Sequence, residues 1–202
     1  MNRKTGLAML GAVVAGGAIA TAVNPPEWLG TKSEEEAMQA MMEAGKLHGP
    51  HEHLGKTLGT YDCVMKFWMD PSQPPMEAKA TAVRTWKIEG RWVQEDFSCP
   101  DLMGQPFQGY SLMGWDNTRK QFVTTWCDSM TTSLMVQRGS ISADMTTITS
   151  IGEMDEPMTG EIGKPVKYVT RQIDDNHAIF EAWEILYGDE FKVMEISYTR
   201  KK

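Results

Sequence analysis

The sequence predicts a mainly β protein, built as one closed antiparallel barrel or as a sandwich. From residue 57 onward, apolar and polar residues alternate with the period of two that is typical of strands with one buried face. Turn signals divide this part of the chain into about ten short segments. No amphipathic helix separates consecutive segments, so hairpins are expected to join them. A closed barrel is favoured because closure leaves no strand edge exposed.

The expected strands cover residues 58–69, 77–88, 91–98, 106–115, 120–128, 132–141, 145–152, 166–174, 177–187 and 190–200. The longest expected loop is 153–165, which contains two prolines and two glycines. The first strand sets the expected register of the barrel. Its inward-facing residues are expected to be Tyr61, Cys63, Met65 and Phe67, and its outward-facing residues Asp62 and Lys66.

The chain divides into three parts. Residues 1–23 are a signal peptide or a transmembrane anchor, residues 24–56 a linker with short helices, and residues 57–202 the barrel domain. Asn24-Pro25-Pro26 ends any preceding helix. Ser33 and Glu36 form a capping box, which predicts a helix over 34–44.

The N-terminal segment predicts export. Residues 5–23 carry no charge and follow Arg3 and Lys4. Two alternatives remain open: a cleaved signal peptide with small residues at its cleavage site, or a retained helix that almost spans a bilayer. Both leave the N-terminus in the cytoplasm and place the barrel in the periplasm or cell envelope.

A retained helix would carry one face of small residues. Ala8, Ala12, Gly16 and Ala20 recur every four positions. Small side chains let another transmembrane helix approach closely. If the segment is retained, we therefore expect it to dock the barrel on a membrane protein complex.

Charge and cysteine content exclude some classes of protein. The chain has a net charge of −7, and an acidic domain is repelled by phosphate backbones, which excludes nucleic acid as a partner. Cys63, Cys99 and Cys127 have no metal or redox spacing. Their odd number permits at most one disulfide. Two alternatives remain open: a Cys63–Cys99 bridge, or three buried free thiols.

Several stretches resemble the bacterial family catalogued as domain of unknown function 1579. They are PHEHLGKTLGTYD (50–62), EGRWVQEDF (89–97), GYSLMGWDNTRKQFVTTWCDSM (109–130) and the C-terminal EISYTRKK. The resemblance covers about residues 48–202. It implies a calycin-like up-and-down barrel, as in lipocalins and fatty-acid-binding proteins, with a short helix at one end. It implies no established activity, cofactor or catalytic residue.

Tryptophans spread over the expected strands are candidates to line or to fill a barrel cavity. Trp126 and Asp128 share one face of their strand, and Asp128 is expected either to pair with Arg84 or Arg171 or to cap a turn before Ser129. The candidate ligand-binding residues are therefore Trp86, Trp92, Trp126, Asp128 and Arg171.

A metal site is a further alternative. His48, His51 and His53 follow a methionine-rich helix, and imidazole with thioether suits copper, whereas imidazole alone suits zinc. The chain shows no nucleophile elbow, HExxH motif or phosphate-binding loop, so no catalytic residue is assigned.

Two non-enzymatic functions remain open for this exported protein. The barrel either binds a small apolar ligand or serves as an extrinsic subunit of a membrane complex through residues 5–23. An enzyme or metal-binding protein with an unrecognised site is the alternative. No cofactor is predicted.

Overall fold

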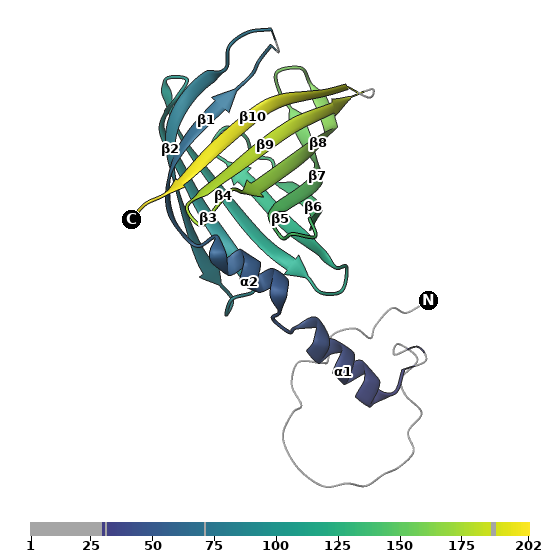
Figure 1. Ribbon diagram of the computed structural model, residues 1–202. Coiled ribbons are helices and arrows are strands. Elements are labelled where there is room, and N and C mark those ends of the chain that lie inside the picture. The colour runs from purple at the N-terminus through teal and green to yellow at the C-terminus, as the bar shows by residue number, and fades with distance from the viewer. Residues whose placement is uncertain (1–29, 31, 71, 187–188) are drawn as a thin grey trace. The chain divides into compact units, whose positions relative to one another are not determined.

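The computed structural model describes residue 30 and residues 32–70, 72–186 and 189–202. Ten antiparallel strands form one closed barrel, in which neighbours in sequence are neighbours in space and β1 pairs with β10 (Figure 1). The prediction of a mainly β, up-and-down barrel is confirmed. The strands are β1 (Gly59–Phe67), β2 (Met76–Lys87), β3 (Trp92–Leu102), β4 (Gln105–Asp116), β5 (Gln121–Asp128), β6 (Met135–Ile141), β7 (Thr147–Glu156), β8 (Glu161–Gln172), β9 (His177–Leu186) and β10 (Asp189–Arg200).

Two helices precede the barrel, α1 (Glu34–Ala44) and α2 (Gly49–Lys56). The expected capping box begins α1: the backbone N–H of Glu36 donates to Ser33 Oγ at 3.2 Å, and that of Ser33 donates to the Glu36 carboxylate at 2.7 Å. Helix α2 lies at one end of the barrel (Figure 1), where Leu54 is fully buried against Phe122 and Val93. The barrel is therefore closed at the α2 end by an apolar plug.

The register of β1 follows the prediction. Tyr61, Cys63 and Met65 are at most 2% exposed, whereas Asp62 is exposed and Lys66 half-buried. Phe67 continues the inward face and packs against the same core. The period-two pattern therefore predicted correctly which face of the first strand is buried.

The predicted loop 153–165 is wrong. Strand β7 continues to Glu156 and β8 begins at Glu161, so the connection is only four residues, 157–160. Gly163 adopts a φ of +69° and the β7–β8 register shifts between Met154 and Glu156, so an irregularity in the ladder accommodates the glycine and proline residues of this hairpin.

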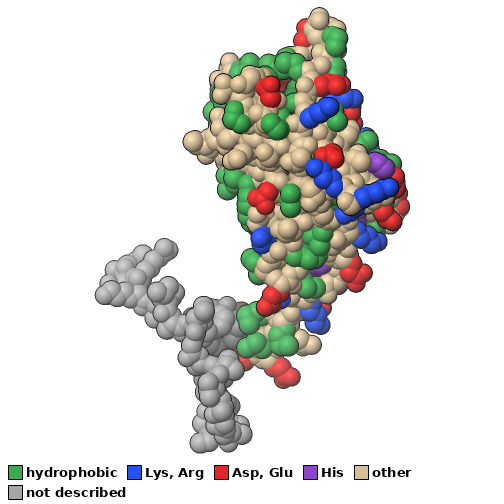
Figure 2. Space-filling view, turned by 90° about the vertical axis from the view of Figure 1, so that its left-hand side faces the viewer, with side chains coloured by type: hydrophobic (Ala, Val, Ile, Leu, Met, Phe, Trp, Pro, Cys, Tyr) green, Lys and Arg blue, Asp and Glu red, His purple; other side chains and the backbone are tan. Residues whose placement is uncertain are grey.

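The outer wall carries mixed side chains. On the face shown in Figure 2, hydrophobic side chains are dispersed among acidic and basic ones across the barrel and form no single continuous patch. On the outer face, exposed Val83 lies between Thr81 and Thr85, and exposed Ile151 lies between Thr149 and Glu153. Isolated exposed apolar residues of this kind are normal for a folded domain.

The segment 5–23, with its candidate packing residues Ala8, Ala12, Gly16 and Ala20, lies outside the described residues. In the part of the chain that the structure describes, no helix has the length and apolarity needed to cross a membrane.

All three cysteines are free thiols. Cys63 on β1 pairs with Ala80 on β2, and Cys99 lies one strand further, on β3. Two strand spacings, about 10 Å, exceed the reach of a disulfide. The structure therefore has free thiols at Cys63 and Cys99, and the alternative of a bridge between them is wrong.

This arrangement predicts the reactivity of each thiol. Burial raises the pKa of Cys63 to about 12, Cys99 is fully buried, and Cys127 is half-exposed. Because the thiolate is the reactive species, we expect a thiol reagent at pH 8 to modify only Cys127 in the folded protein and all three cysteines after unfolding. Rapid modification of Cys63 in the folded protein, located by peptide mass spectrometry, would contradict this placement.

Candidate functional site

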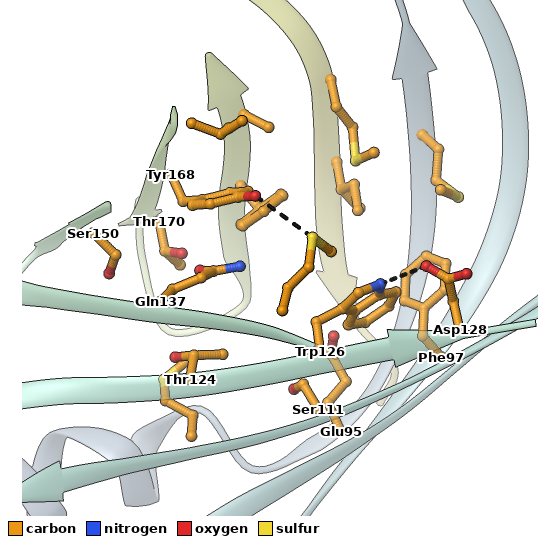
Figure 3. A pocket seen from close by; sticks show the side chains of 18 of the residues that line it. Glu95, Phe97, Ser111, Thr124, Trp126, Asp128, Gln137, Ser150, Tyr168 and Thr170 are labelled. Carbon is orange, nitrogen blue, oxygen red and sulfur yellow. Dashed lines mark hydrogen bonds between the residues drawn. The ribbon is translucent and has the colours of Figure 1, made fainter. Parts of the chain in front are cut away.

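The barrel encloses a cavity of about 240 Å³ (Figure 3). Its wall includes Met130, which is 62% exposed and follows β5 at the end of the barrel opposite α2. The entrance therefore lies at the end that the helix leaves open. An apolar cavity of about 150 Å³ suffices to hold benzene, so this one accommodates a somewhat larger small molecule.

Most of the wall is apolar. The aromatic part is formed by Phe97, Phe107 and Trp126, whose ring centroids lie 6.2–6.4 Å from one another. Gly109 leaves room for the Trp126 indole, because a side chain at that position would occupy the space of the ring. Six methionines add flexible thioether surface: Met65, Met113, Met130, Met135, Met154 and Met194.

Polar side chains form a continuous row along the other part of the wall. Each of five adjacent strands, β4 to β8, contributes one residue. In Figure 3, Thr124, Gln137, Ser150 and Thr170 lie on one side of the pocket, and Ser111 lies next to Glu95. The row consists of Ser111, Thr124, Gln137, Ser150 and Thr170. Such a combination of an apolar wall with a few converging polar groups is typical of small-molecule sites.

A buried ion pair extends this row onto β2 and β3. Arg84 Nε donates a hydrogen bond to Glu95 at about 2.5 Å, and both side chains are 9% exposed. The Arg84 guanidinium also lies 4.5 Å from the ring centroid of Tyr198. Burial alone lowers the pKa of Arg84, but the negative charge of Glu95 outweighs it and the pKa lies above its ordinary value. Arg84 is therefore a buried cation whose counter-ion is the Glu95 carboxylate.

Asp128 is held in place near the entrance. Trp126 Nε1 donates to its carboxylate at 2.8 Å, and the backbone N–H groups of Met130 and Thr131 donate at 2.9 and 3.3 Å. The expected pairing of Asp128 with Arg84 or Arg171 is wrong, and the turn-capping alternative is correct. Asp128 therefore orients Trp126 and the β5–β6 turn at the mouth of the cavity.

The predicted ligand residues separate into two groups. Trp126 and Asp128 line the cavity, whereas Trp86, Trp92 and Arg171 do not belong to its wall. Trp86 packs in the plug beneath α2, and Trp92 covers Gly114 on the neighbouring strand. Arg171 pairs with Glu181 at 3.0 Å on the outer face of β8 and β9.

The histidines are not arranged as a metal centre. The rings of His48 and His51 lie 5.6 Å apart at the start of α2, and His48 Nε2 bonds Asn117 Oδ1 at about 2.5 Å, whereas His53 packs edge-on against Phe122. Burial lowers the pKa of His53, as expected for a neutral packed imidazole. Among the described residues, no group of three or more His, Cys, Asp or Glu side chains converges on one point.

The sequence did not identify the polar row or the Arg84–Glu95 pair as site residues. The signal that points to them is a polar residue at an inward-facing position of a strand. Alternation along each strand shows which positions face inward, and these include Gln137, Ser150 and Glu95. The described wall includes no histidine, cysteine or lysine, and its two carboxylates are already hydrogen-bonded.

These features define a closed, ten-stranded antiparallel β-barrel with an internal pocket of small-molecule size. Residues 46–200 match the family model described as "Protein of unknown function (DUF1579)", and the chain belongs to that family. The expected family resemblance is thereby confirmed.

Comparison with one solved structure supports the barrel fold. The crystal structure of Rv2717c from M. tuberculosis superposes with a TM-score of 0.56 at 14% sequence identity, covering 78% of this chain and 100% of that one. A redesigned β-barrel superposes with a TM-score of 0.40 at 9% identity, covering 74% and 96% of the two chains. No curated protein matches the sequence. At 14% identity, the likeness to Rv2717c shows the fold alone.

Proposed function

We propose that this protein is a non-enzymatic binding protein of the cell envelope, which holds a small, largely apolar ligand inside the barrel. The observation that carries the proposal is the cavity of about 240 Å³, closed by α2 at one end and bounded by exposed Met130 at the other. A preformed apolar pocket binds an apolar molecule because the ligand sheds its own hydration on entry.

A cavity-filling substitution tests this proposal. Ser150 on β7 is buried and faces the cavity, whereas its neighbour Thr149 is exposed on the outer face. Ser150 pairs with Gly139, which adds no side chain to the inward face beside it. The variant Ser150→Trp therefore places an indole in the ligand volume, and Thr149→Trp is the matched control with the same added side chain outside.

We expect 2-naphthol to bind the wild type and Thr149→Trp with one-to-one stoichiometry in calorimetric titration. We expect at least about tenfold weaker binding to Ser150→Trp, because loss of about 1.4 kcal/mol of contact corresponds to a factor of ten. Circular dichroism and urea unfolding establish that both variants are folded. Equal binding by the two variants, or no binding by the wild type, would contradict the proposal.

The N-terminal segment supports a second candidate, docking on a membrane protein complex. The feature that favours it is the small-residue face of Ala8, Ala12, Gly16 and Ala20, which suits close helix packing in lipid. N-terminal sequencing of the native protein discriminates between the candidates. A mature start near Asn24 favours a free carrier and removes the docking candidate, whereas a start at Met1 or Asn2 supports docking.

A further inference from the structure

We infer that the ligand is uncharged and amphipathic, with hydroxyl, carbonyl or amide groups along one edge that bond to the polar row of the cavity. This inference rests on the proposed ligand-binding function and specifies the chemical class of the ligand. The polar row is the set defined above: Ser111, Thr124, Gln137, Ser150 and Thr170.

The members of the row are close neighbours in the strand ladder. Thr124 on β5 pairs directly with Gln137 on β6. Gln137 pairs with Gly152 on β7, which places Ser150 diagonally beside it on the inward face. Ser150 pairs with Tyr168, and Thr170 follows two residues later on the same face of β8. Groups so placed are able to contact a single ligand together.

The row has unused hydrogen-bonding capacity. Ser111 and Gln137 are 7% exposed and Ser150 is 6% exposed. Among the described residues, no side-chain hydrogen bond joins a member of the row to another protein group; the dashed bonds in Figure 3 connect only Tyr168 with Met135 and Trp126 with Asp128. Buried polar groups normally have partners, so molecules within the cavity must supply them.

The Gln137 amide is the most informative member of the row. Its side chain extends into the centre of the pocket in Figure 3. A primary amide offers two donors and an accepting oxygen, and a hydroxyl both donates and accepts. This wall therefore matches a ligand edge that also carries both donors and acceptors. A hydrocarbon would leave these groups unpaired.

The charges on the wall exclude an anionic ligand. Arg84 is the cationic side chain of the described wall, and Glu95 already neutralises it. Asp128 adds a negative charge near the entrance. A carboxylate or phosphate would enter this space without a cation to balance it, and an unpaired buried anion is costly. A neutral polar group has no such penalty.

Three probes with the same ring system test this inference. They are naphthalene, 2-naphthamide and 2-naphthoate, the last of which is ionised at pH 7. The variant Gln137→Leu removes the amide at nearly constant volume. The matched control Gln108→Leu makes the same change at an exposed position on the outside of β4. Replacing a buried polar side chain by an apolar one of similar shape is tolerated by the fold, so both variants are expected to fold.

We expect the wild type and Gln108→Leu to bind 2-naphthamide at least about tenfold more tightly than 2-naphthoate. We expect Gln137→Leu to weaken 2-naphthamide binding by about 3- to 10-fold and to leave naphthalene binding unchanged or tighter, because one hydrogen bond contributes about 1 kcal/mol. Ser150→Ala, which shortens the row by one hydroxyl, is expected to change binding in the same direction.

The outcomes separate the two proposals. If naphthalene binds but 2-naphthoate binds as tightly as 2-naphthamide, the inference on ligand class is overturned and the proposed function stands. The inference is equally overturned if Gln137→Leu weakens all three probes alike. If the wild type binds none of the probes, the proposed function fails and the inference with it.

Discussion

Replacing Glu95 by leucine is expected to destabilise the protein by about 3–5 kcal/mol, because it leaves the buried Arg84 guanidinium without its counter-ion. The Arg84 guanidinium contacts the rings of Tyr198 and Tyr61, at 4.5 and 5.3 Å from their centroids, and these contacts replace only part of the lost attraction. Urea unfolding, monitored by tryptophan fluorescence, measures the loss of stability as a lower midpoint concentration of urea.

A double variant separates the loss of the pair from the loss of packing. Arg84→Met with Glu95→Leu removes both charges at similar volume and is expected to recover most of the stability. Asp62→Asn, which removes an exposed ion pair with Lys201, is the control and is expected to change stability by less than about 1 kcal/mol. A loss below about 1 kcal/mol for Glu95→Leu would show that the pair is hydrated in solution and contributes no buried charge to the cavity.

The second large effect is expected at Gly139 on β6. A side chain at this position would meet the backbone of β7, where the Ser150 Cα would lie 2.6 Å from the added Cβ. Because backbone gives way less easily than the end of a side chain, Gly139→Ala is expected to force β6 and β7 apart and to cost about 3 kcal/mol. Urea unfolding again measures the change.

Ser140→Ala is the control for Gly139→Ala, since Ser140 is the next residue along β6 and is exposed. It is expected to leave stability nearly unchanged. If Gly139→Ala were as stable as Ser140→Ala, the close approach of the two strands at this position would not exist in solution.

The fold was largely predictable because its information is local. Alternation along one strand determines which residues are buried, and ten such segments joined by hairpins leave few arrangements other than a barrel or sandwich. The error in β8 arose because Gly163 and Pro165 are turn residues in isolation, yet an irregular ladder opposite β7 accommodates both.

The site was less predictable because alternation does not tell a residue that lines a cavity from one that fills the core. Trp86 and Trp126 share the inward parity, but Trp86 packs beneath α2 and Trp126 lines the pocket. The difference depends on where the helix closes the barrel, which is a long-range property. Arg84 bonds to Glu95 on the adjacent strand and not to Asp128. Predicting this partner required the register of β2 and β3, which places Arg84 opposite Glu95.

Methyl-labelled methionine gives the most direct test of ligand binding within the barrel. The chain contains sixteen methionines. Six line the cavity, and Met41, Met42 and Met145 are exposed away from it. On titration with 2-naphthamide, we predict that the methyl NMR signals of Met65, Met135 and Met194 shift in a saturable way while those of the exposed group stay in place. Shifts confined to Met41, Met42 and Met145, or no shift at saturating probe, would contradict binding inside the barrel.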